Sequence, residues 1–503
     1  MREKTGGTLF KHLRGQGALL FSGFALSQAM SFGRNAIIGH WLSRGDFGIA
    51  ATLTLMLQLI ETLSDVGVDR MIVQARDGED PRLLSSAHTT LILRGMLTSV
   101  ALFAVATPMT SFFHVHDALA AFQMVALVPL IKGFMHLDTR RFQRRLLNGP
   151  QMMVEVVPQA LTLALVVPTL TWVPGYSAIV WLSFAQAFFT LAVSHLMSER
   201  PYKASLEPQF LIRLLQFGWP IWLSAFPLVM VFQGDRILIG RVYGMEVLAG
   251  YTAAFMMTMV PGVVAAKIGH ALMLPLLSDR RDDDKGFLQS FTLMADLTVV
   301  VACMYLFAFA SVGGKILPIA FGPNYHDLGL IVAWLALMWS LRMVQAVPGM
   351  GLMALGDTRP LLVAGFVRAL GLLGAVACVQ SGLGIIGVVA SGVVAEFASL
   401  LYVSQRMSRD RTGAASILLS RAAFLAPVAV GGFVLMMTLD AQAAFAMAMF
   451  VGATGTIMVG LCVALGMPSS RRLFMELYRY IVMSQRAPVL PGKKSKLLDC
   501  PAE

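Results

Sequence analysis

About fourteen stretches of roughly twenty mostly apolar residues run along this chain, and they restrict its fold more than any other feature. A helix of that length crosses the hydrocarbon core of a bilayer, which is about 30 Å thick. Backbone polar groups in hydrocarbon must be satisfied within the segment, which favours helices. Only 13% of the residues are charged, whereas soluble domains carry about 25%. The sequence therefore predicts an all-α integral membrane protein with about 14 transmembrane helices.

The apolar stretches are separated by short polar segments, which makes their approximate limits readable. We expect spans at roughly 17–42, 46–67, 84–109, 117–137, 151–172, 175–198, 217–242, 246–274, 287–311, 326–348, 360–380, 382–405, 418–438 and 442–466. The first span follows a basic start without a clear cleavage site, so we interpret it as an uncleaved span.

Lysine and arginine are distributed unevenly between the loops on the two sides of the membrane. If the N-terminus is cytoplasmic, the loops on that side hold most of the 39 basic residues, and the opposite loops hold only Arg44, Arg241 and Lys315. Cytoplasmic loops are enriched in basic residues, so both termini are expected to be cytoplasmic. The net charge of +11 thus reflects membrane topology, and no nucleic-acid partner is expected.

A pattern in residues 30–50, MSFGRNAIIGHWLSRGDFGIA, recurs in residues 231–251, VFQGDRILIGRVYGMEVLAGY. Gly39 is matched by Gly240, and an arginine occurs in the same half-turn of both copies, at Arg34 and Arg236. Internal repeats of this kind are common in membrane transporters. We expect a six-helix bundle in 1–200, an amphipathic cytoplasmic connector in 201–216, a second six-helix bundle in 217–406, two additional spans in 407–467, and a cytoplasmic interfacial helix and tail in 468–503.

Enzyme signatures are missing from the sequence. It contains no G-x-x-x-x-G-K-[ST] loop, no H-E-x-x-H and no G-x-S-x-G. His114, His116 and Asp117 lie in a turn between spans, where a polar turn is a simpler interpretation than a metal site. We therefore expect no catalytic activity, no metal and no cofactor.

Charged residues inside the spans are the remaining candidates for function. A charge at mid-bilayer costs at least about 2.5–3.5 kcal/mol, so each needs a partner or a wet cavity. The candidates for substrate binding are Arg34, Arg94, Asp235, Arg236, Lys267, Arg342 and Arg368, and those for ion coupling are Glu61, Asp296 and Glu396. Ion pairs between helices are the alternative for most of them.

Arg34 and Arg236 are the strongest candidates because their repeat-equivalent positions predict the same depth on opposite walls of a central cleft. The planar guanidinium group suits a phosphate or diphosphate that it contacts through two hydrogen bonds.

Four segments also resemble a known family. Residues 41–50 (WLSRGDFGIA) with 63–67 (LSDVG), residues 235–251 (DRILIGRVYGMEVLAGY) and residues 274–278 (LPLLS) are similar to motifs of the polysaccharide transporter family. These are the Wzx-type oligosaccharide flippases of the MOP exporter superfamily. Ser43 and Arg44 replace the usual Gly-Pro, and Val68 stands where leucine is usual.

The resemblance implies a MATE/MOP-like fold, with two pseudo-symmetric six-helix bundles and two C-terminal helices. It further implies a flippase that moves an undecaprenyl-diphosphate-linked oligosaccharide across the bacterial inner membrane by alternating access, for exopolysaccharide, capsule or O-antigen (lipopolysaccharide) biosynthesis. Membrane lipid, the polyprenyl-diphosphate-linked oligosaccharide, a polysaccharide polymerase and a chain-length regulator are the expected partners. A MATE-type cation-coupled multidrug antiporter and a membrane enzyme are the alternatives.

Overall fold

The computed structural model describes residues 2–145, 147–442, 445–467 and 471. Within them the chain forms α-helices and two short 3-10 helices, and no strand. Twelve of the described helices are long and apolar enough to cross a membrane. The predicted interfacial helix and tail at 468–503 lie outside the described residues apart from position 471. The all-α membrane fold predicted from the sequence is confirmed.

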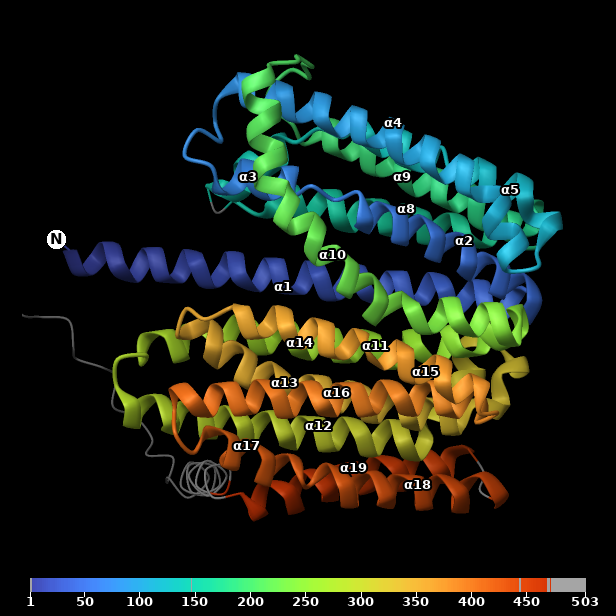
Figure 1. The fold of residues 1–503 in the computed structure, drawn as a ribbon, viewed down its shortest axis with the longest axis vertical. Coiled ribbons are helices and arrows are strands. Elements are labelled where there is room, and N and C mark those ends of the chain that lie inside the picture. Colours follow the sequence, from blue (N-terminus) through green and yellow to red (C-terminus); the bar gives the residue numbers. More distant parts are fainter. Residues whose placement is uncertain (1, 146, 443–444, 468–470, 472–503) are drawn as a thin grey trace, which may run out of the picture.

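The first lobe contains the helices up to residue 196, drawn in blue to green in Figure 1. They are α1 (Arg2–Trp41), α2 (Arg44–Leu63), α3 (Val68–Gln74), α4 (Pro81–Phe112), η1 (His116–Ala118), α5 (Leu119–Val125), α6 (Val128–Gly133), α7 (Asp138–Arg144), α8 (Gly149–Trp172) and α9 (Ser177–Leu196). Helix α1 packs along α8 and lies between the rest of this lobe and the second lobe (Figure 1).

The second lobe follows a linker and packs on the other side of α1. Its helices are α10 (Pro208–Tyr243), α11 (Met245–Asp279), α12 (Asp284–Phe321), η2 (Pro323–Leu328), α13 (Gly329–Ala354), α14 (Arg359–Ala369), α15 (Gly371–Gln380) and α16 (Gly384–Asp410). The remaining helices, α17 (Ala414–Ala422), α18 (Leu425–Gln442) and α19 (Phe445–Gly466), pack on the outside of this lobe against α12.

Two of the fourteen expected spans differ from simple transmembrane helices. The fourth, expected at 117–137, is broken into α5 and α6, and the axis bends by 57° before α7. Helix α1 is absent from the twelve apolar helices because Gln28, Ser31, Arg34 and Asn35 interrupt its apolar sequence. The connector expected at 201–216 is likewise not a separate helix, since residues from Pro208 onward continue into α10 without a break.

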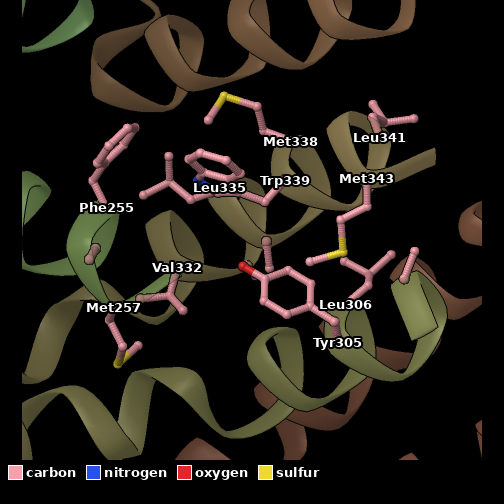
Figure 2. Packing of buried hydrophobic residues seen from close by; sticks show 14 of the residues in the cluster. Phe255, Met257, Tyr305, Leu306, Val332, Leu335, Met338, Trp339, Leu341 and Met343 are labelled. Carbon is pink, nitrogen blue, oxygen red and sulfur yellow. The ribbon is translucent and has the colours of Figure 1, made fainter. Parts of the chain in front are cut away.

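The interior of the second lobe is held by close helix packing. Phe255 of α11 and Trp339 of α13 meet edge to face with ring centres 6.0 Å apart (Figure 2). The Tyr305 hydroxyl of α12 donates to the Thr258 carbonyl at 2.7 Å. Lipid is as apolar as these side chains, so membrane helices associate largely through tight packing, often at small residues. A Cβ on Gly314 of α12 would lie 2.6 Å from the Gly329 Cα of α13. The second lobe is therefore a closely packed body.

The break between the first two helices of each lobe lies at the position that the sequence repeat predicts. Helix α2 begins after Ser43, whose hydroxyl accepts a hydrogen bond from the Asp46 N–H at 3.1 Å, as an N-cap does. Helix α10 ends before Gly244, whose φ of 85° lies in the left-handed region that glycine tolerates. We call the end of the molecule with these two turns the outer end. The opposite end, which the basic loops predict to be cytoplasmic, is called the inner end.

The two lobes are in contact at the outer end. Gly48 of α2 lies so close to α11 that a Cβ on it would be 2.1 Å from the Met245 carbonyl oxygen. The ring of Phe47 meets Phe321 at 6.0 Å and Tyr325 at 6.2 Å, and the Arg44 guanidinium lies 5.5 Å from the Tyr325 ring centre. Backbone and aromatic contacts between the lobes thus close the outer end.

Candidate functional site: a cationic cleft between the lobes

A cavity of about 410 Å³ lies between the lobes, on the inner side of this closure. Helices α1 and α2 of the first lobe and α10 and α11 of the second form its walls. Its polar lining residues are Gln28, Ser31, Arg34, Asn35, Thr54, Gln58, Thr62, Gln233 and Arg236. None of the described residues that line it is a carboxylate. We call this cavity the central cleft.

Helical spacing explains how four apolar helices present a polar cleft. On α2 the polar positions are Thr54, Gln58 and Thr62, each four residues from the next. Gln233 and Arg236 of α10 are three apart. Residues three or four apart lie on one face of an α-helix. The walls from α2 and α10 therefore each turn a narrow polar stripe to the cleft, whereas α11 lines it with Met256, Met259 and Val260.

Arg34 and Arg236 lie at matching depths. Arg34 precedes the end of α1 at Trp41 by seven residues, and Arg236 precedes the end of α10 at Tyr243 by the same number. With a rise of 1.5 Å per residue, each lies about 10 Å from the outer end of its helix. Thr62 lies one residue before α2 ends at Leu63, so the cleft reaches from the two arginines to the inner end of α2.

Neither arginine has a carboxylate within ion-pair distance among the described residues. Arg34 donates to the side-chain oxygen of Gln186 on α9. Arg236 is 8% exposed, lies 4.3 Å over the Phe255 ring, and its Nε has no hydrogen-bond partner in the described part of the chain. Two guanidinium groups therefore line the cleft without an ion-paired carboxylate among the described residues, an arrangement that suits an anion.

Asp235 points away from this cleft. Its carboxylate accepts a hydrogen bond from the Tyr251 hydroxyl, and it lines a separate small pocket of about 50 Å³ inside the second lobe. Adjacent helical residues point about 100° apart, which places Arg236 and Asp235 on different faces of α10.

Three more candidate residues lie in the same second-lobe pocket. Arg342 of α13 donates through Nε to Glu396 of α16 at 2.7 Å, and its guanidinium stacks 4.5 Å from the Trp339 ring. Arg368 also lines the pocket, and its Nε has no partner among the described residues. Arg342, Arg368 and Glu396 therefore do not line the central cleft, and a role for them in substrate binding or ion coupling stays a prediction.

Arg94 and Glu61 belong to a pocket of about 170 Å³ inside the first lobe. Lys132 of α6 donates to Glu61 at 2.9 Å, and Arg94 donates to the Glu61 carbonyl at 2.9 Å and to the Asp65 carboxylate at 3.5 Å. Arg94 and Glu61 are therefore both in ion pairs, although the side chain of Glu61 remains 28% exposed.

The last two candidates lie in the second lobe and contact different parts of the molecule. Asp296 of α12 is fully buried and accepts from Arg421 of α17 at 3.0 Å, which ties the C-terminal helices to the second lobe. Lys267 of α11 is exposed, and its ammonium lies 3.0 Å over the Phe24 ring of α1. Lys267 thus contacts the first lobe without lining the central cleft.

Several uncharged polar residues that line the central cleft were not predicted from the sequence. Gln28, Asn35, Gln58 and Gln233 line the central cleft, and Gln233 donates to Gln58 at 3.2 Å across the two lobes. Carboxamides are rare in apolar spans, and the spacing of Gln58 with Thr54 and Thr62 was visible in the sequence. Polar residues at helical spacing, and not charges alone, mark these walls in the sequence.

Comparison with known proteins assigns the chain to a family. A family model described as polysaccharide biosynthesis protein matches residues 37–329, which is more than half of the chain. The chain belongs to the polysaccharide biosynthesis protein family. This confirms the resemblance to the polysaccharide transporter family that the sequence motifs indicated.

Two relatives of this family member are named as biosynthesis proteins. The amylovoran biosynthesis protein AmsL of Erwinia amylovora is 22% identical over 272 residues, covering 53% of this chain and 69% of the relative. The teichuronic acid biosynthesis protein TuaB of Bacillus subtilis (strain 168) is 22% identical over 334 residues, covering 64% of this chain and 67% of the relative.

Solved structures share the fold of this family member at low sequence identity. The lipid II flippase MurJ in an inward closed conformation matches with a TM-score of 0.68 and 13% identity, over 92% of this chain and 100% of that one. An inward-facing multidrug resistance MATE transporter of the MOP superfamily matches with a TM-score of 0.62 and 15% identity, over 77% and 96%. The MATE/MOP-like fold predicted from the sequence is confirmed.

Proposed function

We propose that this protein is a flippase that moves an undecaprenyl-diphosphate-linked oligosaccharide across a bacterial inner membrane by alternating access, with both termini in the cytoplasm. The observation that carries the proposal is the pair of guanidinium groups, Arg34 and Arg236, on opposite lobes of a cleft that no described carboxylate lines. Membership in the polysaccharide biosynthesis protein family supports a cargo that is used to build a polysaccharide.

The physical need for such a cleft follows from the cargo. An ionised group crossing hydrocarbon without compensation loses its hydration at a cost of many kcal/mol. The two arginines and the surrounding carboxamides replace that hydration, while the polyprenyl chain stays in lipid at the gap between the lobes. The contacts of Gly48 and Phe47 close the outer end, so the state described here receives cargo from the inner side.

Transport then requires a second state in which those outer contacts separate and the inner ends of the lobes approach. The energy source of this cycle is a proton or Na⁺ gradient in our proposal, with Glu61, Asp296 and Glu396 as the candidate coupling carboxylates. Each of the three accepts from a basic side chain. Proton binding to any of them would therefore release a cation and loosen a contact between helices.

The MATE-type antiporter is the alternative that the fold leaves open. A drug cation needs a carboxylate or a polarising acceptor in the site, and the described lining of the central cleft has two cations instead. The charge of the cleft therefore favours an anionic cargo. The fold that this chain shares with the lipid II flippase MurJ favours transport over a membrane enzyme.

Complementation of a deletion strain tests the proposed function. Arg34→Ala and Arg236→Ala should abolish export of the polymer and leave the lipid-linked unit inside the cell, because each removes one cationic wall of the cleft. Arg359→Ala, at an exposed position outside the cleft, is the matched control and should export normally. Full export by both cleft variants would contradict the proposal.

Arg236→Lys separates two ways of binding the phosphate. We expect partial loss of export, because lysine keeps the charge but cannot form two parallel hydrogen bonds. Unchanged export would show that a point charge is sufficient at this position.

A further inference from the structure

A hydrogen bond crosses the central cleft between two carboxamides. The Gln233 Nε2 of α10 donates to the Gln58 Oε1 of α2 at 3.2 Å, and both side chains line the cavity. The other end of the Gln233 carboxamide is unsatisfied, because its Oε1 is buried without a partner among the described residues. We call this pair the carboxamide bridge.

The carboxamide bridge lies next to the cation of its own helix. Gln233 precedes Arg236 by three residues, which places it on the same face of α10 and about 4.5 Å closer to the inner end. A sugar is joined to the diphosphate through one oxygen atom. If Arg236 binds the diphosphate, the hydroxyl groups of the first sugar are within reach of this carboxamide.

We propose that the carboxamide bridge recognises the sugar attached directly to the diphosphate, that this sugar is uncharged, and that it carries hydroxyl or acetamido groups. The bridge opens when the sugar binds, and a hydroxyl or amide N–H donates to the Gln233 Oε1. This inference rests on the proposed function, since it takes a diphosphate-linked sugar as the cargo.

Hydrogen-bonding capacity supports this choice of ligand. A carboxamide offers one acceptor oxygen and two N–H donors, which matches the mixed donors and acceptors of a sugar. An acceptor that is buried without a partner favours any ligand that brings a donor to it. The aromatic residues Phe32 and Phe232 also line the cavity, and a sugar ring can pack its C–H face on such rings.

The charge balance of the cleft supports an uncharged sugar. The described lining has two cations and no carboxylate, and a diphosphate diester carries two negative charges. The diphosphate therefore neutralises Arg34 and Arg236. A uronic acid as the first sugar would add a negative charge for which the described lining has no further cation, and desolvation of that charge would weaken binding.

The cavity size is consistent with recognition of this part of the cargo. Small-molecule sites enclose roughly 300–1,000 Å³, and the central cleft encloses about 410 Å³. That volume lies at the lower end of the range and suits a diphosphate with its first sugar better than a complete repeat unit. Acidic sugars further along the unit are outside the reach of the bridge.

Binding measurements on the purified full-length protein in lipid nanodiscs test the inference. Three undecaprenyl diphosphate diesters serve as probes: the N-acetylglucosaminyl, the glucuronosyl and the cyclohexyl diester. The cyclohexyl probe keeps the charge of the diphosphate and presents a ring without hydroxyl groups. We expect wild-type protein to bind the N-acetylglucosaminyl probe about tenfold more tightly than either other probe, which corresponds to one well-formed hydrogen bond.

Gln233→Leu and Gln58→Leu should each reduce the affinity for the N-acetylglucosaminyl probe to that for the cyclohexyl probe, and should leave the cyclohexyl affinity unchanged. The two variants change opposite lobes, so misfolding of one does not remove the test. Gln159→Leu is the matched control: its Oε1 is also buried without a described partner, but it lies on α8 outside the cleft. It should keep the preference of the wild type.

Two results would overturn the inference. One is a tenfold preference that persists in both bridge variants, and the other is equal wild-type affinity for the glucuronosyl and N-acetylglucosaminyl probes. Arg236→Ala reports on the proposed function separately, because it should weaken all three probes equally. Wild-type protein that binds none of the three would refute the flippase proposal itself, and the inference with it.

Discussion

Gly48 is the residue at which the closed outer end is most sensitive to a small change. It lies in the first turns of α2, and a Cβ there would be 2.1 Å from the Met245 carbonyl oxygen, 2.6 Å from its carbon and 2.9 Å from the Cα. All three atoms are backbone atoms of the second lobe, so no side-chain rotation relieves the overlap. Gly48→Ala therefore requires the two lobes to separate locally.

The size of the effect follows from these distances. Real Cβ contacts are essentially never under 3.0 Å, so the Met245 oxygen must move by about 0.9 Å or more. Overpacking of a close contact costs about 1–3 kcal/mol. Because the contact exists only when the outer end is closed, the substitution destabilises the outward-closed state alone. The equilibrium should shift toward outward-open by a factor of about 5–150.

Pulsed electron–electron double resonance measures this shift as a change in the distance distribution between two spin labels. Spin labels at Trp172 and Ser381, both exposed at the outer ends of the two lobes, report the outer separation. The native cysteines Cys303, Cys378, Cys462 and Cys500 must be replaced first. Gly48→Ala should populate longer outer distances than wild type.

Gly45→Ala is the matched control, because its added Cβ meets only the Ser43 Oγ, at 3.9 Å. It lies in the same turn of α2 and should keep the distance distribution of the wild type. If the two variants give the same distribution, contact at Gly48 does not hold the outer end closed, and the reasoning fails.

Three further substitutions test the ion pairs. Glu396→Gln should lower the free energy of unfolding by about 3 kcal/mol, because it leaves the Arg342 guanidinium without its carboxylate partner. Denaturant titrations in detergent measure this loss, and the double variant Arg342→Met, Glu396→Gln should recover most of it. No recovery in the double variant would contradict the pairing. Asp296→Asn should weaken the attachment of α17–α19, because it removes the carboxylate that pairs with Arg421. Limited proteolysis should then cleave faster between residues 411 and 413. A cleavage pattern identical to that of the wild type would show that the Arg421–Asp296 contact does not anchor these helices. The Asp77 carboxylate accepts a hydrogen bond from Arg213, which holds the pKa of Asp77 below the usual 3.8. This ion pair therefore stabilises the protein above pH 4, and the stabilisation is lost as the pH falls through the lowered pKa. Asp77→Asn should reduce this pH dependence of the free energy of unfolding by less than about 1 kcal/mol, and an unchanged pH dependence would refute the role of the Asp77–Arg213 pair.

Much of the architecture was readable from the sequence because the bilayer imposes strict rules. Helix lengths follow from its thickness, and the repeat located the breaks at Ser43 and Gly244. The fourth span was harder, since the apolar content of residues 117–137 continues across the breaks between α5, α6 and α7. Apolar content measures whether a segment tolerates lipid, and it does not show whether the helix axis bends within it.

The candidate site was only partly readable, for a different reason. Repeat symmetry placed Arg34 and Arg236 at one depth because it acts on whole helices. The partners of the other charges depend on helix packing: Glu61 meets Lys132 across 71 residues, and Arg342 meets Glu396 across 54. Nothing local in the sequence records such pairs. Gln58 and Gln233 were not predicted because they carry no charge.

Transport in vesicles tests the central claim most directly. Wild-type protein and the Arg34→Ala and Arg236→Ala variants are reconstituted into liposomes with a fluorescent undecaprenyl-diphosphate-linked oligosaccharide, and a membrane-impermeant quencher reports the fraction in each leaflet. The account predicts that wild-type protein equilibrates the probe between the leaflets, while each arginine variant leaves it in the leaflet where it began. Equilibration by both variants at the wild-type rate would contradict the claim that this cationic cleft carries the cargo.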